Sequence, residues 1–122
     1  MLLQIVERKI EPDIVVLELA GRLALGRESQ KIETMVDAIL QQGARKAILD
    51  MTAVDYIDSA GLGLLALTAG KMNDEGGKLV VVAPPGRVLR MLQMTQMTAI
   101  VTVVDTIDKA QTAVNESQQA SA

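Results

Sequence analysis

Short apolar runs of strand length alternate with stretches of helical period along the chain, and this order constrains the fold more than any other feature. Strand-like runs are expected at residues 2–9, 13–21, 46–51, 78–83 and 100–104. Helices are expected at residues 26–43, 59–74, 86–95 and 105–114. Strands that alternate with helices after an initial hairpin form a mixed, mostly parallel sheet covered by helices. We therefore predict an α/β fold with an N-terminal hairpin and about four helices.

Apolar spacing predicts how three of these helices pack. In the first helix, one face carries Ile32, Met35, Val36, Ile39 and Leu40. In the second helix, apolar residues cover most of the circumference, which predicts burial on several sides. They are Leu62, Leu64, Leu65, Ala66, Leu67 and Ala69. We interpret Met91, Met94 and Met97 of the third helical region as core residues, with an adaptable contact surface as the alternative.

Composition narrows the classes of function. A length of 122 residues favours one domain, expected over residues 1–114, with a flexible tail over residues 115–122. The net charge of −3, the single Tyr and the absence of Phe and Trp argue against a nucleic-acid partner. The chain has no Cys and no His, which excludes thiolate chemistry and a Ser-His-Asp triad within it, so we do not expect an enzyme. No signal peptide or membrane span is recognised, so a cytoplasmic protein is expected.

The segment "VDYIDSAGLGLLAL" places Ser59 at the start of the second helix. Its hydroxyl could cap the helix by accepting a hydrogen bond from a free backbone N–H. Alternatively, Ser59 is a modifiable serine, since a phosphate at a helix N-terminus meets oriented N–H groups and the positive end of the dipole. Such a phosphate would add charge to a docking surface without melting the domain.

Neighbouring residues suggest two further sites, and we favour neither. Asp50, Asp55 and Asp58 could hold Mg²⁺, but they also fit a solvated strand end followed by a cap residue, so no metal site and no cofactor is expected. Gly61, Gly63 and Ala66 formally match a dinucleotide fingerprint. That motif must directly follow a strand, and it requires an acidic residue at the end of the next strand. The strand is expected to end near Met51, so the context does not fit.

The stretch "LDMTAVDYIDSAGLGLLALTAG" resembles the signature of the STAS domain family, the anti-sigma factor antagonists. The segments "VLELAGRLAL" and "GGKLVVVAPPGRVLRMLQMTQMTAIVTVVDTIDKA" extend the resemblance over nearly the whole chain. Three positions depart from the family pattern. Ala24 stands where many members have aspartate, Ala60 where many have Ser or Thr, and Gln96 where a glycine usually ends the third helix.

The resemblance implies a mechanism and a site. Unphosphorylated antagonists bind an anti-sigma factor that is also a serine kinase and supplies ATP, and this binding frees the sigma factor. Phosphorylation of Ser59 would release the partner, and a PP2C-type phosphatase would reset the chain. The implied partner-binding residues are Asp55, Asp58, Ser59, Ala60, Gly61, Leu62 and Gly63. The alternative is a non-switching STAS scaffold, or an accessory subunit of a signalling or transport complex. The oligomeric state stays open.

Overall fold

The fold is built on one five-stranded sheet, seen in a computed structural model that describes residues 3–11, 13–24 and 26–116. The strands lie in the order β1 (Gln4–Glu11), β2 (Ile14–Leu23), β3 (Lys46–Ile57), β4 (Lys78–Val82) and β5 (Thr102–Val104). β1 pairs antiparallel with β2, and the other neighbours pair parallel. The predicted mixed, mostly parallel sheet with an N-terminal hairpin is therefore confirmed.

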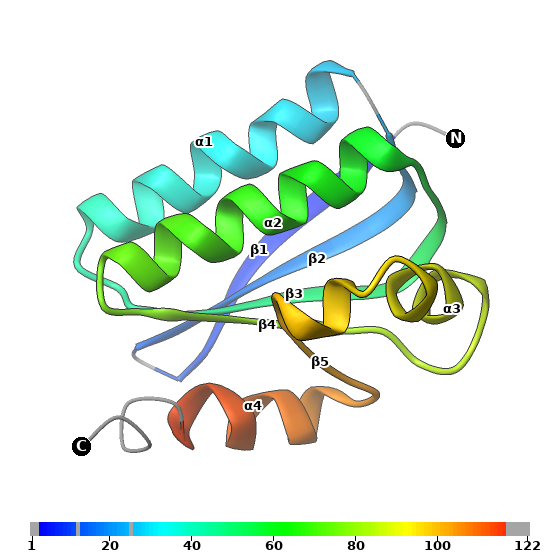
Figure 1. Cartoon of the computed structure of the whole chain (residues 1–122). Coiled ribbons are helices and arrows are strands. Elements are labelled where there is room, and N and C mark those ends of the chain that lie inside the picture. Colours follow the sequence, from blue (N-terminus) through cyan, green and yellow to red (C-terminus); the bar gives the residue numbers. More distant parts are fainter. Residues whose placement is uncertain (1–2, 12, 25, 117–122) are drawn as a thin grey trace.

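Helices cover both faces of the sheet (Figure 1). They are α1 (Arg27–Gln41), α2 (Ser59–Asp74), α3 (Arg87–Met94) and α4 (Ile107–Glu116), with the short 3-10 helix η1 (Met97–Ala99) before β5. α1 and α2 lie side by side on one face, and α4 lies on the other. The main core, which includes Leu17, Leu49 and Leu65, lies under α1 and α2. A second core, which includes Ile14, Ile48 and Val114, lies under α4.

β3 is longer than the sequence predicts, because it continues past Met51 to Ile57. Its second half pairs with the second half of β2, where Ala20 lies opposite Ala53 and Arg22 opposite Tyr56. The pairing shifts register twice along this half. Of the β3 residues that follow Met51, only Val54 and Ile57 are buried. They are three positions apart, so this half of the strand lacks the alternation of apolar and polar residues that marks a strand in a sequence.

α2 has the bounds that the sequence predicts, and the expected burial on several sides holds in part. Its buried residues are Gly61, Leu65, Thr68 and Met72, which share one face. Leu67 is 46% exposed on the opposite side. The helix therefore packs on the sheet through one face and on α1 at its side, and it leaves Leu67 exposed.

The interpretation of the three methionines as core residues holds only for Met97, which is buried. Met91 is 36% exposed and Met94 is 74% exposed. Between α3 and η1, Gln96 adopts a left-handed conformation with φ of 61°, the conformation for which a glycine would be expected.

α4 continues to Glu116, two residues past the expected domain end. Asn115 belongs to this helix and accepts a hydrogen bond from Lys46 at 2.7 Å. The rest of the expected tail, residues 117–122, lies outside the described residues. In the part of the chain that the structure describes, no helix has the length and apolar character needed to cross a membrane.

Candidate functional site

The site begins where β3 ends and α2 starts. Ile57 closes the strand, and Asp58 follows in extended conformation as the N-cap of α2. The Asp58 carboxylate accepts a hydrogen bond from the backbone N–H of Gly61 at 2.9 Å. The interpretation of Ser59 as the cap residue is therefore wrong, because Asp58 makes the capping bond one position earlier.

Ser59 is the first residue of α2, and its side chain is exposed. Among the described residues, its hydroxyl makes no hydrogen bond. The first turn of α2 contains no acidic residue. A phosphate on this hydroxyl would therefore meet the positive end of the helix dipole without displacing an existing bond.

Gly61 fixes how the start of α2 sits against the end of β2. A Cβ atom at this position would overlap the carbonyl oxygen of Leu23 and lie 2.9 Å from the Ile57 side chain. The same Leu23 oxygen accepts a hydrogen bond from the N–H of Asp58 at 3.3 Å. Gly61 is buried, so it positions the surface around Ser59 without being exposed on it.

This contact also explains the apparent dinucleotide fingerprint. Since β3 runs to Ile57, the glycines follow a strand more closely than the sequence predicts. However, the chain's own backbone fills the space at Gly61, and β4 is followed by Ala83, which has no carboxylate. A nucleotide therefore has neither the backbone approach nor the ribose partner that the motif needs.

The three aspartates have separate environments. Asp50 accepts hydrogen bonds from the backbone N–H and the hydroxyl of Thr52, at 3.1 and 2.6 Å. Asp58 caps α2, and Asp55 is exposed. Within the described residues, no group of three His, Cys, Asp or Glu side chains converges as a metal site would require.

The predicted partner-binding residues differ in exposure. Ser59, Ala60 and Gly63 are exposed, as is Asp55, whereas Leu62 is half-buried and packs against the main core. The exposed members can form a contact surface directly. Leu62 and Gly61 shape it from below.

The structure adds a part of this surface that sequence reasoning did not place. A hollow of about 360 Å³ lies between the carboxyl end of β3 and the turn that leads into α3. Asp55 lines it from β3, and Pro85 and Arg87 line it from the turn and from α3. The Pro-Pro-Gly run marks a turn in the sequence, but only the parallel pairing of β3 with β4 brings that turn to Asp55.

Ala24 follows Leu23, whose carbonyl oxygen lies against Gly61. It is half-buried and contributes no charge where many family members carry aspartate. Nearby, the Arg22 guanidinium lies 4.1 Å from the centre of the Tyr56 ring. Because Leu23 and Ile57 point into the main core under α2, Arg22 and Tyr56 project from the other face of the sheet.

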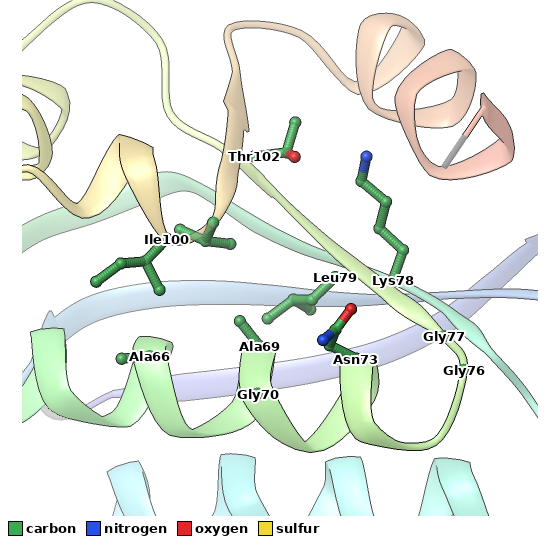
Figure 2. Close-up of a pocket in the computed structure, with 11 residues that line it drawn as sticks. Ala66, Ala69, Gly70, Asn73, Gly76, Gly77, Lys78, Leu79, Ile100 and Thr102 are labelled. Carbon is green, nitrogen blue, oxygen red and sulfur yellow. The ribbon is translucent and has the colours of Figure 1, made fainter. Parts of the chain in front are cut away.

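A larger hollow, of about 580 Å³, lies between α2 and the β4–β5 side of the sheet. Figure 2 shows Ala66, Ala69 and Asn73 lining it from α2, with Ile100 and Thr102 on the opposite side. None of the predicted site residues lines this hollow. The candidate site is therefore the surface around Ser59.

Comparisons with known proteins agree with this geometry. A Thermotoga maritima protein classed as an anti-sigma factor antagonist is 29% identical, with a TM-score of 0.80 over 91% of this chain and 94% of its own. The anti-sigma factor antagonist SpoIIAA, in unphosphorylated form, is 18% identical, with a TM-score of 0.70. The match covers 90% of this chain and 96% of SpoIIAA. SpoIIAA from Bacillus has also been solved in phosphorylated form, at 19% identity and a TM-score of 0.69 over 91% and 99%.

A sulfate transporter family protein from Wolinella succinogenes shares the fold as well, at 18% identity and a TM-score of 0.70. The match covers 88% of this chain and 89% of that protein. No curated protein matches the sequence. The family model of the STAS domain matches residues 6–110, which include every strand but the start of β1, and the whole candidate site. The chain belongs to the STAS domain family.

Proposed function

We propose that this chain is an anti-sigma factor antagonist that is switched at Ser59. In the unmodified form it binds an anti-sigma factor that is also a serine kinase, and this binding releases a sigma factor. The binding surface comprises Asp55, Asp58, Ser59, Ala60, Gly61, Leu62 and Gly63. The observation that carries the proposal is the exposed Ser59 hydroxyl, which is free of the capping role that Asp58 fills.

The electrostatics of the site support a switch that acts on docking. A phosphate on Ser59 carries a charge of about −2 at neutral pH. The helix N-terminus accommodates that charge, so the fold is kept. A partner seated over Ser59 would instead meet new bulk and negative charge, together with the exposed carboxylate of Asp55.

The remaining components follow from this role. The kinase partner would bring its own ATP, and a PP2C-type phosphatase would remove the phosphate. Both would act on this chain in the cytoplasm. Since Ala24 leaves the site without the aspartate of many relatives, we expect the partner kinase to recognise the site without that carboxylate.

Two variants of Ser59 test the proposal. Ser59→Asp should weaken binding to the anti-sigma factor kinase of the same organism by at least about tenfold, which is about 1.4 kcal/mol. Ser59→Ala should bind as the unmodified chain does and accept no phosphate. Asn73→Asp is the matched control, because it adds a negative charge at the other exposed end of the same helix. Titration calorimetry measures the affinities, and equal affinity of the Ser59→Asp and Ser59→Ala variants would falsify the switch.

The second candidate is a non-switching STAS scaffold or an accessory subunit of a transport complex. The fold that the chain shares with the Wolinella succinogenes sulfate transporter family protein favours it. Mass spectrometry of the chain from its native cells separates the two candidates. Phosphatase-sensitive phosphate on Ser59 supports the switch. Stable co-purification with a transporter, without phosphate on Ser59 under any growth condition, supports the accessory subunit.

A further inference from the structure

The larger hollow, of about 580 Å³, is a gap in the edge of the sheet (Figure 2). β4 begins at Lys78, but β5 pairs with it only from Val80 onward, opposite Thr102. The first two residues of β4, Lys78 and Leu79, therefore have β3 on one side and no strand of the described chain on the other. Both residues line the hollow. We call this gap the notch.

The short helix η1 before β5 creates the notch. The N–H groups of Ile100 and Val101 both donate to the Met97 carbonyl oxygen, at 2.9 Å. These two bonds turn the chain away from β4 before it can extend β5 toward Lys78. Val101 directly precedes β5 and lines the notch, so it closes the end of the gap that faces β5.

Two backbone groups point into the notch. The Lys78 N–H donates to the Arg45 carbonyl oxygen at 2.8 Å, on the β3 side. Because a trans peptide points its C=O and N–H in opposite directions, the Gly77 carbonyl points toward the notch. Successive residues of a parallel strand bond to alternate sides, so the Leu79 N–H points there as well. Within the described residues neither group has a hydrogen-bond partner, although Gly77 and Leu79 are buried.

This pair of groups matches what one residue of a parallel strand offers. Buried backbone N–H and C=O groups are nearly always paired in folded proteins. In a parallel ladder, the carbonyl of one residue and the N–H two residues later bond to the same residue of the next strand. One residue of an added strand, parallel to β4, would therefore satisfy both the Gly77 carbonyl and the Leu79 N–H.

The two sides of the notch differ in chemistry. The side chains of Lys78 and Thr102 lie on the side away from α2, whereas Ala66, Ala69 and Ile100 lie on the α2 side (Figure 2). Within the described residues, the Lys78 ammonium forms no ion pair. An added strand would therefore be favoured by a negative charge beside Lys78 and by an apolar side chain toward α2.

We propose that the notch binds the carboxyl-terminal end of a partner protein as a short strand parallel to β4. The last residue would donate its N–H to the Gly77 carbonyl, and its carboxylate would accept from the Leu79 N–H beside the Lys78 ammonium. A chain end fits because Val101 fills the next position along the strand. The penultimate side chain would point to Ala69, since side chains alternate. This inference does not rest on the proposed function, because no predicted site residue lines the notch.

Peptide titration followed by amide NMR signals tests the proposal. The probe is the acetylated pentapeptide Gly-Val-Ser-Val-Glu with a free carboxyl terminus, which places valine toward α2. It should shift the signals of Gly77, Leu79 and Asn73, which all line the notch. The carboxyl-amide of the same peptide lacks the terminal charge and should bind at least about tenfold more weakly. Gly-Val-Ser-Glu-Val, which reverses the alternation, should bind more weakly as well.

Three variants of the chain locate the binding. Ala69→Leu fills the α2 side of the notch and should abolish binding, while leucine keeps the helix. Lys78→Met removes the ammonium and should weaken binding of the free acid at least about fivefold. Lys109→Met removes an exposed ammonium elsewhere and should change nothing. Circular dichroism checks that each variant is folded, and Lys78→Met decides alone if Ala69→Leu is not.

The outcomes separate the notch from the kind of ligand. Unshifted Gly77 and Leu79 signals at about 10 mM peptide, far weaker than ordinary recognition, would overturn the notch as a binding site. Binding that persists unchanged in both Ala69→Leu and Lys78→Met would do the same. Equal affinities of the free acid and the carboxyl-amide would overturn the chain end as the ligand. None of these results depends on Ser59, so they leave the proposed switch to its own test.

Discussion

At the scale of single residues, Asp58 and Ser59 are neighbours with separate tasks. Asp58 carries the capping bond to Gly61, and Ser59 presents an exposed hydroxyl. Asp58→Ala should therefore lower the free energy of unfolding by about 1 kcal/mol, the usual loss of an N-cap. Ser59→Ala should change it by less than about 0.5 kcal/mol. Urea denaturation measures both, and the reverse order would return the capping role to Ser59.

The two glycines that follow should respond oppositely to the same substitution. At Gly61 a Cβ atom overlaps the Leu23 carbonyl oxygen, so Gly61→Ala must shift backbone and should destabilise the chain by about 2 kcal/mol. At Gly63 the space is empty and the residue is helical, so Gly63→Ala should stabilise it by up to about 1 kcal/mol. Thermal unfolding of the pair checks the assignment. Equal destabilisation by both variants would contradict it.

The sequence predicts the site at this scale only to within one residue. Asp and Ser are both good N-cap residues, so the pair Asp58–Ser59 does not say which of them caps. The choice depends on where the preceding strand ends, and β3 ends at Ile57 because its second half pairs with β2. That pairing joins residues far apart in the chain, which local preferences do not encode.

At the scale of elements, one lysine ties the two outer helices together. Lys71 of α2 lies 3.0 Å from a Glu33 carboxylate oxygen and 3.1 Å from one of Asp37, both in α1. Hydrogen bonds to Glu33 and then to Asp37 raise the pKa of Lys71 above its usual 10.5. The charged ammonium is favoured in the folded state, so this contribution to stability is present below pH 10.5 and is lost as pH rises through the raised pKa.

The melting temperature of Lys71→Met compared with the native chain tests this link. The native chain should melt higher at neutral pH, and the difference should shrink as the pH rises beyond 10.5. High salt should shrink it as well, since the pair is partly exposed. Lys109→Met is the control, because it removes an ion pair to Asp105 that does not join two helices. A Lys71→Met difference that is constant with pH would assign the effect to packing.

The predicted bounds of a helix agree with the structure where apolar residues recur along the whole segment. The bounds of α2 agree with the prediction, since capping residues and a glycine pair delimit its apolar run. Periodicity reports which residues are apolar, while neighbours decide which are covered, so it overstates the burial of Leu67. For the same reason the pattern predicts Met91 and Met94 in the core, although the buried residues of α3 are Val88 and Leu92.

At the scale of the whole molecule, α4 completes the fold by covering the second core. Ala110 and Val114 are fully buried against Ile14, Ile48 and Val80. Loss of these two residues should therefore unfold a chain that is otherwise folded. A chain that ends after residue 109 loses both contacts and should be largely unfolded, since uncovering several aliphatic side chains costs about 1.5–3 kcal/mol each. Circular dichroism tests this outcome, and a folded 109-residue chain would contradict it.

The sequence predicts the topology of the sheet, but it does not predict the hollow beside the site. Alternating strands and helices restrict the connections to a few arrangements, and the observed strand order follows the chain order. The hollow between Asp55 and Arg87 depends on how far β3 extends and on where the turn after β4 lies beside it. Both depend on strand register, which a single sequence leaves open.

The separation of Asp58 from Ser59 also bears on how long each form of the chain would survive in a cell. Proteases act mainly on chains that open, and the open fraction follows the free energy of unfolding. Because the cap does not involve the Ser59 hydroxyl, a phosphate there should leave that fraction nearly unchanged. Both forms would then be degraded at similar rates. Under the proposed switch, the ratio of the two forms would report the balance of kinase and phosphatase, undistorted by protein turnover.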